Sequence, residues 1–139
     1  MIKILLVDNH ELVRTGIRHI LKEVGDMDVV GEAADGDSAL KVASKLVPDV
    51  VLMDVKMPGM GGIEATRRSM VRLLPNTRVI ALTMLDDDPF PARLNEAGAV
   101  GYLTKGCPAK EMIEAVRTVS SGLQYVSANV ARKYMLASW

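Results

Sequence analysis

Five short apolar runs alternate with segments of helical period, and this alternation most constrains how the 139-residue chain can fold. The runs lie at residues 2–7, 28–34, 50–53, 79–83 and 99–103. The first intervening segment repeats apolar residues such as Ile17, Ile20 and Leu21 on one helical face. Alternating strand and helix patterns are typical of βα units around a parallel sheet. We therefore predict an α/β fold with five parallel strands.

The composition of individual runs indicates where they lie in the sheet. Residues 50–53 are all apolar, whereas the run at 28–34 contains Gly31 and Glu32. A strand buried on both faces reads as continuously apolar, so the third strand should be central and the second exposed. Pro48 and Pro75 are predicted to end the second and third helices. We assign residues 1–122 to one domain and residues 123–139 to a short helix, with Ser127 as its N-cap, or to the start of a linker.

Bulk composition excludes several classes of function. The formal net charge is zero and the pI is about 6.7, so the chain has no broad electrostatic footprint for nucleic acid or an anionic membrane. No run approaches the roughly 20 apolar residues that span a bilayer, and no signal peptide precedes the first strand, which favours a cytoplasmic protein. Cys107 is the single cysteine, which excludes an intrachain disulfide.

Four of the predicted strands end in residues that could handle a phosphoryl group. Ligands of open parallel α/β sheets bind just outside the carboxyl ends of the strands, so these residues should converge on one site. A strand-end carboxylate beside a second oxygen donor suits Mg²⁺, and a hydroxyl and a cation could bind phosphoryl oxygens. The residues are Asp8 and Asn9, Asp54, Thr83, and Thr104 with Lys105.

Each of these residues also has an ordinary structural explanation. Asp54 could be a loop or capping residue, and Asp8 with Asn9 could cap the helix that begins near Glu11. Thr83 taken alone is a strand-end threonine, and Lys105 could be a solvated loop charge. Their recurrence at neighbouring strand ends favours the functional explanation. The histidines, His10 and His19, show no metal-ligand spacing and are predicted to be surface residues.

Taken together, the strand-end motifs resemble the receiver domain of bacterial two-component response regulators. The resemblance covers residues 2 to about 120, with the motifs in the correct order. Within the family, the chain is similar to the branch with a LuxR-type output, and in that branch to the GacA/UvrY/LetA group of global regulators. It implies a doubly wound five-stranded sheet of flavodoxin-like order 2-1-3-4-5. The motifs are Val7-Asp8-Asn9-His10, Leu52-Met53-Asp54-Val55-Lys56-Met57-Pro58-Gly59-Met60-Gly61-Gly62, Leu82-Thr83-Met84 and Gly101-Tyr102-Leu103-Thr104-Lys105-Gly106.

The resemblance assigns a role to each site residue. Asp54 would accept a phosphoryl group, and Lys105 would contact that group. Mg²⁺ would be held by Asp54, by Asp8 and Asn9 at the acid-pair position, and by the backbone carbonyl of Lys56. Thr83 would move toward the aspartyl phosphate, and Tyr102 would be the coupled aromatic switch. This chain departs from the family at Asn9, where a second acid is usual and is usually a direct metal ligand.

The resemblance also implies partners. The phosphoryl donor would be a sensor histidine kinase or a histidine phosphotransfer domain, and a phosphorylation-dependent homodimer is compatible with the family. DNA would be bound through an output domain downstream of the receiver. The sequence ends at Trp139, so two alternatives stay open: a receiver separated from its output domain, or a stand-alone receiver.

Three other functions remain to be weighed against a phosphoacceptor that catalyses only its own phosphorylation and dephosphorylation. A pseudo-receiver that binds partners without phosphorylation is favoured by Asn9 alone. A phosphatase of the haloacid dehalogenase type needs a second aspartate two positions after the nucleophile, where this chain has Lys56. A nucleotide-binding flavodoxin-like role lacks a Walker or GxGxxG motif.

Overall fold

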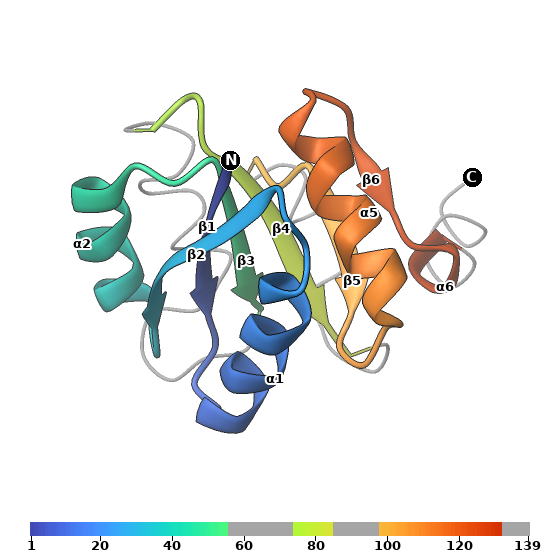
Figure 1. The fold of residues 1–139 in the computed structure, drawn as a ribbon, viewed down its shortest axis with the longest axis horizontal. Coiled ribbons are helices and arrows are strands. Elements are labelled where there is room, and N and C mark those ends of the chain that lie inside the picture. The colour runs from blue at the N-terminus through green and yellow to red at the C-terminus, as the bar shows by residue number, and fades with distance from the viewer. Residues whose placement is uncertain (56–73, 85–97, 132–139) are drawn as a thin grey trace.

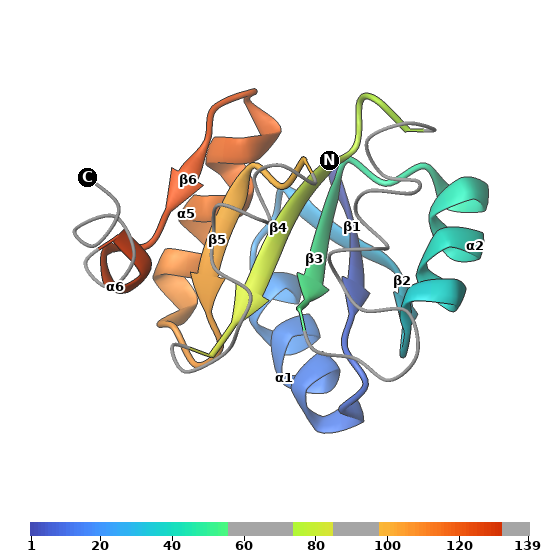
Figure 2. The same cartoon turned by 180° about the vertical axis from the view of Figure 1, so that it is seen from behind.

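The fold is a twisted parallel sheet with helices on both faces, seen in a computed structural model that describes residues 1–55, 74–84 and 98–131 (Figures 1 and 2). Its strands are β1 (Ile2–Val7), β2 (Met27–Ala33), β3 (Val50–Asp54), β4 (Arg78–Thr83), β5 (Gly101–Thr104) and β6 (Tyr125–Val126). Its described helices are α1 (Glu11–Lys22), α2 (Gly36–Leu46), α5 (Ala109–Ser120) and α6 (Ala128–Val130). The third predicted helix, with Ile63 and Met70, lies outside the described residues.

The sheet order is β2-β1-β3-β4-β5-β6, and every described pair is parallel. The predicted order 2-1-3-4-5 is therefore confirmed, as is the central third strand, and the second strand lies at the edge of the sheet with its middle residues partly exposed. All five residues of β3 are buried, whereas β2 at the edge is buried only at its two end residues. A continuously apolar sequence thus marks the strand that is covered on both faces.

The sheet has one strand more than the sequence predicted. Tyr125 pairs with Gly101 and Val126 with Tyr102, so β6 adds a sixth parallel strand beyond β5. Its two residues are too few for a period-2 pattern to be recognised in the sequence. The segment after Gly122 continues into α6, where the Ser127 side chain accepts a hydrogen bond from the Val130 amide at 3.2 Å, as the predicted N-cap should.

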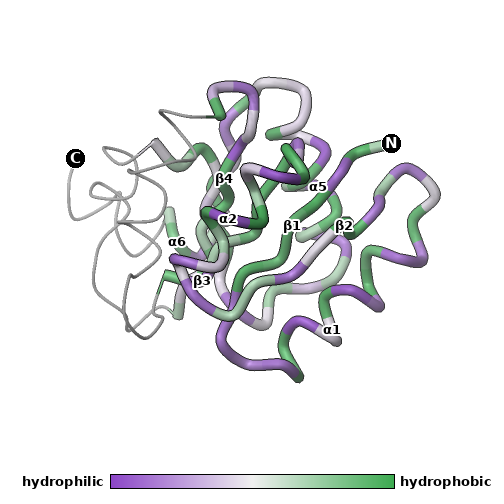
Figure 3. The backbone as a smooth tube through the Cα atoms, turned by 90° about the vertical axis from the view of Figure 1, so that its left-hand side faces the viewer, coloured by the Kyte–Doolittle hydropathy of each residue, from purple (hydrophilic) through white to green (hydrophobic). Residues whose placement is uncertain are grey.

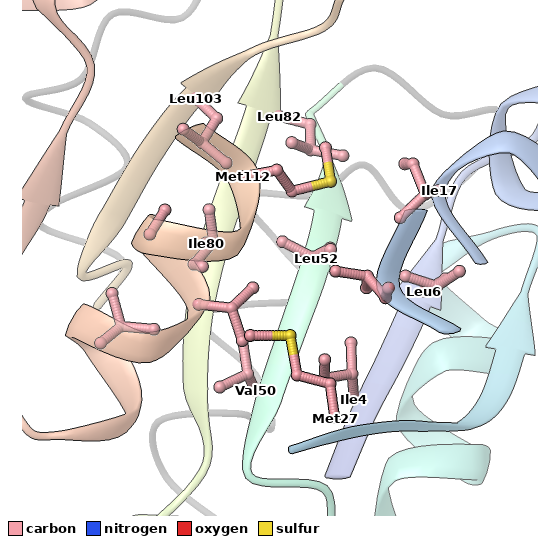
Figure 4. Close-up of a cluster of buried hydrophobic side chains, with 14 residues drawn as sticks. Ile4, Leu6, Ile17, Met27, Val50, Leu52, Ile80, Leu82, Leu103 and Met112 are labelled. Atoms are coloured by element: carbon pink, nitrogen blue, oxygen red, sulfur yellow. The ribbon is translucent and has the colours of Figure 1, made fainter. Parts of the chain in front are cut away.

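Two apolar layers cover the two faces of the sheet. Helices α1 and α5 lie on one face, where Ile17 of α1 and Met112 of α5 pack on strand residues such as Leu52 (Figure 4). Helix α2 and Val130 of α6 belong to the opposite layer, which contains Tyr102. Figure 3 shows the result as a hydrophobic interior along the strands and alternating hydrophobic and hydrophilic stretches along the helices. Side chains alternate between the faces because successive strand residues point to opposite sides.

Two of the described helices, α2 and α5, end beside a left-handed residue, and α2 ends before Pro48 as predicted. Helix α2 ends at Leu46, and Val47 takes a left-handed conformation with φ of 45° before Pro48, which disfavours helical geometry in the preceding residue. Gly122, with φ of 95°, follows the end of α5, where a left-handed residue suits glycine. Within the described residues, none of the helices combines the length and the apolar character needed to cross a membrane.

Candidate functional site

The site lies at the carboxyl ends of the central strands, where the parallel topology brings four chain segments together. Asp8 follows β1, Asp54 ends β3, Thr83 ends β4, and Lys105 follows β5. Register fixes these ends side by side, since Met53 is opposite Val7 and Thr83 is opposite Thr104. Residues that are far apart in the sequence thereby share one site, as expected for an open parallel sheet.

Lys105 joins the two carboxylates of the site. Its Nζ lies 2.9 Å from Asp54 Oδ2 and 3.4 Å from Asp8 Oδ2. The Asp54 and Asp8 side chains are almost fully buried, at 1% and 2% exposure, and that of Lys105 is 18% exposed. Two buried carboxylates that contact the same ammonium group lie close enough to repel each other, and the positive charge of Lys105 offsets part of that repulsion.

The pKa of Lys105 reflects both its burial and its contacts with the two carboxylates. Burial alone would lower its pKa, because removing water disfavours the ammonium form. The hydrogen bond to Asp54 and the negative charges of Asp54 and Asp8 outweigh burial, and the pKa of Lys105 is raised above its ordinary value. The lysine is therefore a cation throughout the physiological range.

Backbone hydrogen bonds hold the loops of the site. The Lys105 amide donates to the Thr83 carbonyl at 2.9 Å, and the Val55 amide donates to the Leu82 carbonyl at 3.2 Å. Arg14 of α1 donates to the Asp8 carbonyl and pairs through Nε with Glu32 Oε1 at 3.0 Å. The turn after β1 is thus tied both to the first turn of α1 and to the neighbouring strand β2.

Asp8 and Asn9 do not cap α1, contrary to their ordinary structural explanation. The N-cap residue is His10, which forms no side-chain capping bond. Asp8 instead accepts a hydrogen bond from the His10 amide at 2.8 Å, and Asn9 is exposed. The buried carboxylate of Asp8 therefore contacts His10 through Oδ1 and faces Lys105 through Oδ2.

Thr83 and Tyr102 lie on the face of the sheet that α2 and α6 cover. The Thr83 side chain donates to the carbonyl of the next residue, Met84, at 2.9 Å. Tyr102 is 2% exposed, and its hydroxyl donates to the Ala99 carbonyl at 3.1 Å. Alternation places Thr83 on the same face as Ala81, which is the strand partner of Tyr102. The two predicted switch residues therefore share a layer in this structure.

His10 is a site residue that sequence analysis missed. As predicted, its side chain is exposed, at 62%, but its Nδ1 lies 3.1 Å from Asp8 Oδ1. Asp8, His10 and Asp54 each offer one ligand atom, and these atoms all lie within 4.8 Å of one another. The Asp-x-His spacing gave no signal because the third member of the group comes from β3. The predicted ligand Lys56 lies outside the described residues.

Comparison with known proteins gives the same assignment as the site. Residues 4–117 match the response regulator receiver domain family. The chain is 52% identical over 139 residues to response regulator GacA of Pseudomonas syringae pv. syringae (strain B728a), and the match covers 100% of this chain and 64% of that protein.

Two solved structures extend this result. A two-component response regulator of the LuxR family from Aurantimonas sp. SI85-9A1 aligns with a TM-score of 0.87 and 34% identity, covering 98% of this chain and 96% of that one. A structure of two RcsB dimers bound to two parallel DNAs aligns with a TM-score of 0.82 and 26% identity, covering 96% and 68%. The strand order, the buried aspartates beside Lys105 and these similarities lead to one conclusion: the chain belongs to the receiver domain family of two-component response regulators.

Proposed function

We propose that Asp54 is the phosphoacceptor of this receiver domain. The observation that carries the proposal is the 2.9 Å ion pair between Asp54 Oδ2 and Lys105 Nζ at the end of the central strand. A carboxylate oxygen of Asp54 would attack the phosphorus of a phosphohistidine. The new O–P bond forms as the N–P bond breaks, and the departing imidazole keeps the electron pair. Lys105 would stabilise the charge that develops on the phosphoryl oxygens.

Mg²⁺ is the proposed cofactor of this transfer, and the donors present fit it. Asp8 and Asp54 provide buried carboxylate oxygens, the ligand type that Mg²⁺ prefers. Asn9 and the carbonyl of Lys56 complete the proposed ligand set. When bound, the ion would neutralise charge on the phosphoryl oxygens. Asn9 supplies an amide in place of the usual second acid, which lowers the negative charge available to the ion by one unit.

The proposed donor is a sensor histidine kinase or a histidine phosphotransfer domain, because response regulators receive signals from histidine kinases. The chain spans 64% of the length of its GacA relative. We propose that a DNA-binding output domain acts downstream of residues 1–122 and that segment 123–139 leads toward it. The structure of two RcsB dimers bound to two parallel DNAs supports a homodimer here, and we propose that phosphorylation favours it.

Thr83 and Tyr102 are the proposed switch residues. A hydroxyl that turns toward an aspartyl phosphate would have to give up its 2.9 Å hydrogen bond to the Met84 carbonyl. That exchange would favour one of two pre-existing conformations and would not create a new one. The shared layer of Thr83 and Tyr102 provides the physical route between them.

Intact-mass analysis with a small phosphodonor tests the assignment of Asp54. Incubation with phosphoramidate and Mg²⁺ should add one phosphoryl group to the wild-type chain and none to Asp54→Asn. Asp28→Asn is the matched control, because Asp28 is an exposed aspartate in β2 and should leave the added mass unchanged. Persistence of the added mass in Asp54→Asn would place the phosphoacceptor elsewhere.

The same experiment separates a phosphoacceptor from a pseudo-receiver, the alternative that Asn9 favours. A pseudo-receiver would gain no phosphoryl mass even with excess Mg²⁺ and phosphodonor. A phosphoacceptor with a weakened metal site would gain it at a higher Mg²⁺ concentration.

A further inference from the structure

The turn between β1 and α1 brings an imidazole to the carboxylates of the site. His10 Nδ1 lies 3.1 Å from Asp8 Oδ1, and the His10 amide donates to the same oxygen at 2.8 Å. The amide contact holds the turn closed and places the Cβ of His10 within reach of the carboxylate. Asn9, the residue between them, is exposed.

The separation of the two atoms is suited to ligands of a single cation. Two ligand atoms in adjacent positions of a metal ion, each about 2.1 Å from it, lie about 3.0 Å apart. The observed 3.1 Å between Nδ1 and Oδ1 matches this spacing. Asp54 is the third member, with its ligand atom within 4.8 Å of the other two.

A second observation points to a ligand that the protein does not supply. Asp8 is buried, and its Oδ2 has no hydrogen-bond donor in bonding geometry among the described residues, although Lys105 Nζ lies 3.4 Å away. Leaving a buried carboxylate oxygen without full compensation costs free energy. A cation bound at Asp8 would compensate the charge of that carboxylate, and the exposed ring of His10 could join it without rearrangement of the core.

We propose that His10 is a metal ligand of this site, and that the site consequently binds a divalent first-row transition cation more tightly than Mg²⁺. The proposal rests on the proposed function in that it concerns the same site. It differs in the identity of one ligand and in the resulting order of cation affinities.

The selectivity follows from the chemistry of the donors. Mg²⁺ takes oxygen ligands and gains little from an imidazole nitrogen, whereas Co²⁺, Ni²⁺ and Zn²⁺ bind imidazole well. A second acid in place of Asn9 would have strengthened binding of every divalent cation through charge. An amide there and an imidazole next to it shift the balance from charge toward ligand type. His10 therefore sets which cation the site prefers.

Calorimetric titration of the whole chain with Co²⁺ and with Mg²⁺, in a buffer that does not chelate metals, tests the proposal. Wild type is compared with His10→Ala. His19→Ala is the matched control, because His19 is an exposed histidine on α1, the helix that follows His10. His10 forms no side-chain cap, so its removal should not unfold α1. Circular dichroism spectra verify that each variant is folded.

We expect Co²⁺ to bind wild type more tightly than Mg²⁺ and to lose at least about tenfold in affinity in His10→Ala, since groups that merely support a ligand already contribute about 10–100-fold. Mg²⁺ affinity should change less than twofold, and His19→Ala should bind both ions as wild type does. In NMR spectra, Co²⁺ should shift the ring protons of one histidine, and those signals should vanish in His10→Ala alone.

Three results would overturn the proposal: equal losses of Co²⁺ and Mg²⁺ affinity in His10→Ala, no loss of either, or wild-type binding that favours Mg²⁺. None of them touches the phosphoacceptor assignment, which depends on the mass added at Asp54. Conversely, a chain that is never phosphorylated would still show whether His10 governs Co²⁺ affinity. The two failures are therefore distinguishable.

Discussion

At the scale of single residues, Tyr102 shows how burial fixes the chemical state of a side chain. Its ring lies in the apolar layer under α6, and its hydroxyl donates to the Ala99 carbonyl. Removal from water disfavours the phenolate, and this raises the pKa of Tyr102 to about 12. The ring is therefore a neutral hydrogen-bond donor under any physiological condition.

This raised pKa predicts a loss of stability in alkali. Below about pH 10, the phenol is protonated in both the folded and unfolded states and contributes no pH dependence. Above that, the unfolded state releases the proton first, so the free energy of unfolding falls as the pH rises toward about 12, by at most about 3 kcal/mol. Urea unfolding of wild type and Tyr102→Phe across this range isolates the effect.

Tyr102→Phe should be less stable than wild type near neutral pH by about 0.5–1.5 kcal/mol, because the Ala99 carbonyl loses its donor. This difference in the free energy of unfolding should shrink or reverse above about pH 11, because ionisation of the unfolded state destabilises only the protein that has a phenol. Parallel pH profiles for the two proteins would show that the Tyr102 phenol titrates as it does in water.

How far the site could be predicted also depends on individual residues. Asp8, Asp54, Thr83 and Lys105 could be located because each ends a strand or follows a strand end, and strand ends of a parallel sheet converge whatever the loops do. His10 could not be located this way. Its position relative to Asp8 depends on the backbone of a short turn, which side-chain periodicity does not encode.

At the scale of elements, two glycines show that close packing constrains β2 and β5 differently. A Cβ added to Gly101 would lie 2.8 Å from Ile80 Cγ1 and 3.3 Å from Ile80 Cβ, on a side chain that is 0% exposed. A Cβ added to Gly31 would lie 2.7 Å from Leu46 Cδ1, at the free end of a side chain that is 37% exposed. Ile80 has no room to move, whereas Leu46 can rotate outward.

Gly101→Ala should therefore destabilise the domain by about 1–3 kcal/mol, the usual range for overpacking a buried site. Gly31→Ala should cost at least about 1 kcal/mol less, because the clash is relieved by rotation and alanine restricts the unfolded chain. Urea midpoints with unchanged m-values measure both variants. Equal destabilisation would mean that Leu46 is held as firmly as Ile80.

The strands show which parts of the fold the sequence could predict. The order of β1 to β5 follows from hydrophobic runs long enough to be recognised, and the apolar character of β3 identifies the centre of the sheet. The short strand β6 was missed because it is defined by its partner: Tyr125 and Val126 form a strand through their pairing with Gly101 and Tyr102. Such long-range pairing has no local signature.

At the scale of the whole molecule, the segment after Gly122 is packed on the domain as far as the structure describes it. The Ser127 amide donates to the Tyr102 carbonyl at 3.0 Å, and Val130 is fully buried in the layer that contains Tyr102. We infer that this part of the segment folds together with the sheet. A movement of Tyr102 would then act directly on the segment that is proposed to lead toward an output domain.

Val130→Ala tests this cooperativity. Removing buried carbon atoms at about 0.8 kcal/mol per methylene equivalent, with an added cavity cost, should lower the free energy of unfolding by about 2 kcal/mol. The loss should appear in a single transition, seen equally by far-UV circular dichroism and by near-UV circular dichroism, which reports the packing of tyrosines such as the buried Tyr102. A separate early transition, or an unchanged midpoint, would show that α6 is not part of the cooperative unit.

The sixth strand also determines which backbone the sheet offers to other molecules. Without β6, the amides and carbonyls along the outer side of β5 would form an open edge beside the apolar residues Tyr102 and Leu103, and an edge of that kind is a template for pairing with another chain. Tyr125 and Val126 pair with the first two residues of β5, and the strand that they form is itself only two residues long, which offers a short edge for further pairing. The same contact that joins the segment after Gly122 to Tyr102 therefore disfavours pairing of another chain along the β5 side of the sheet.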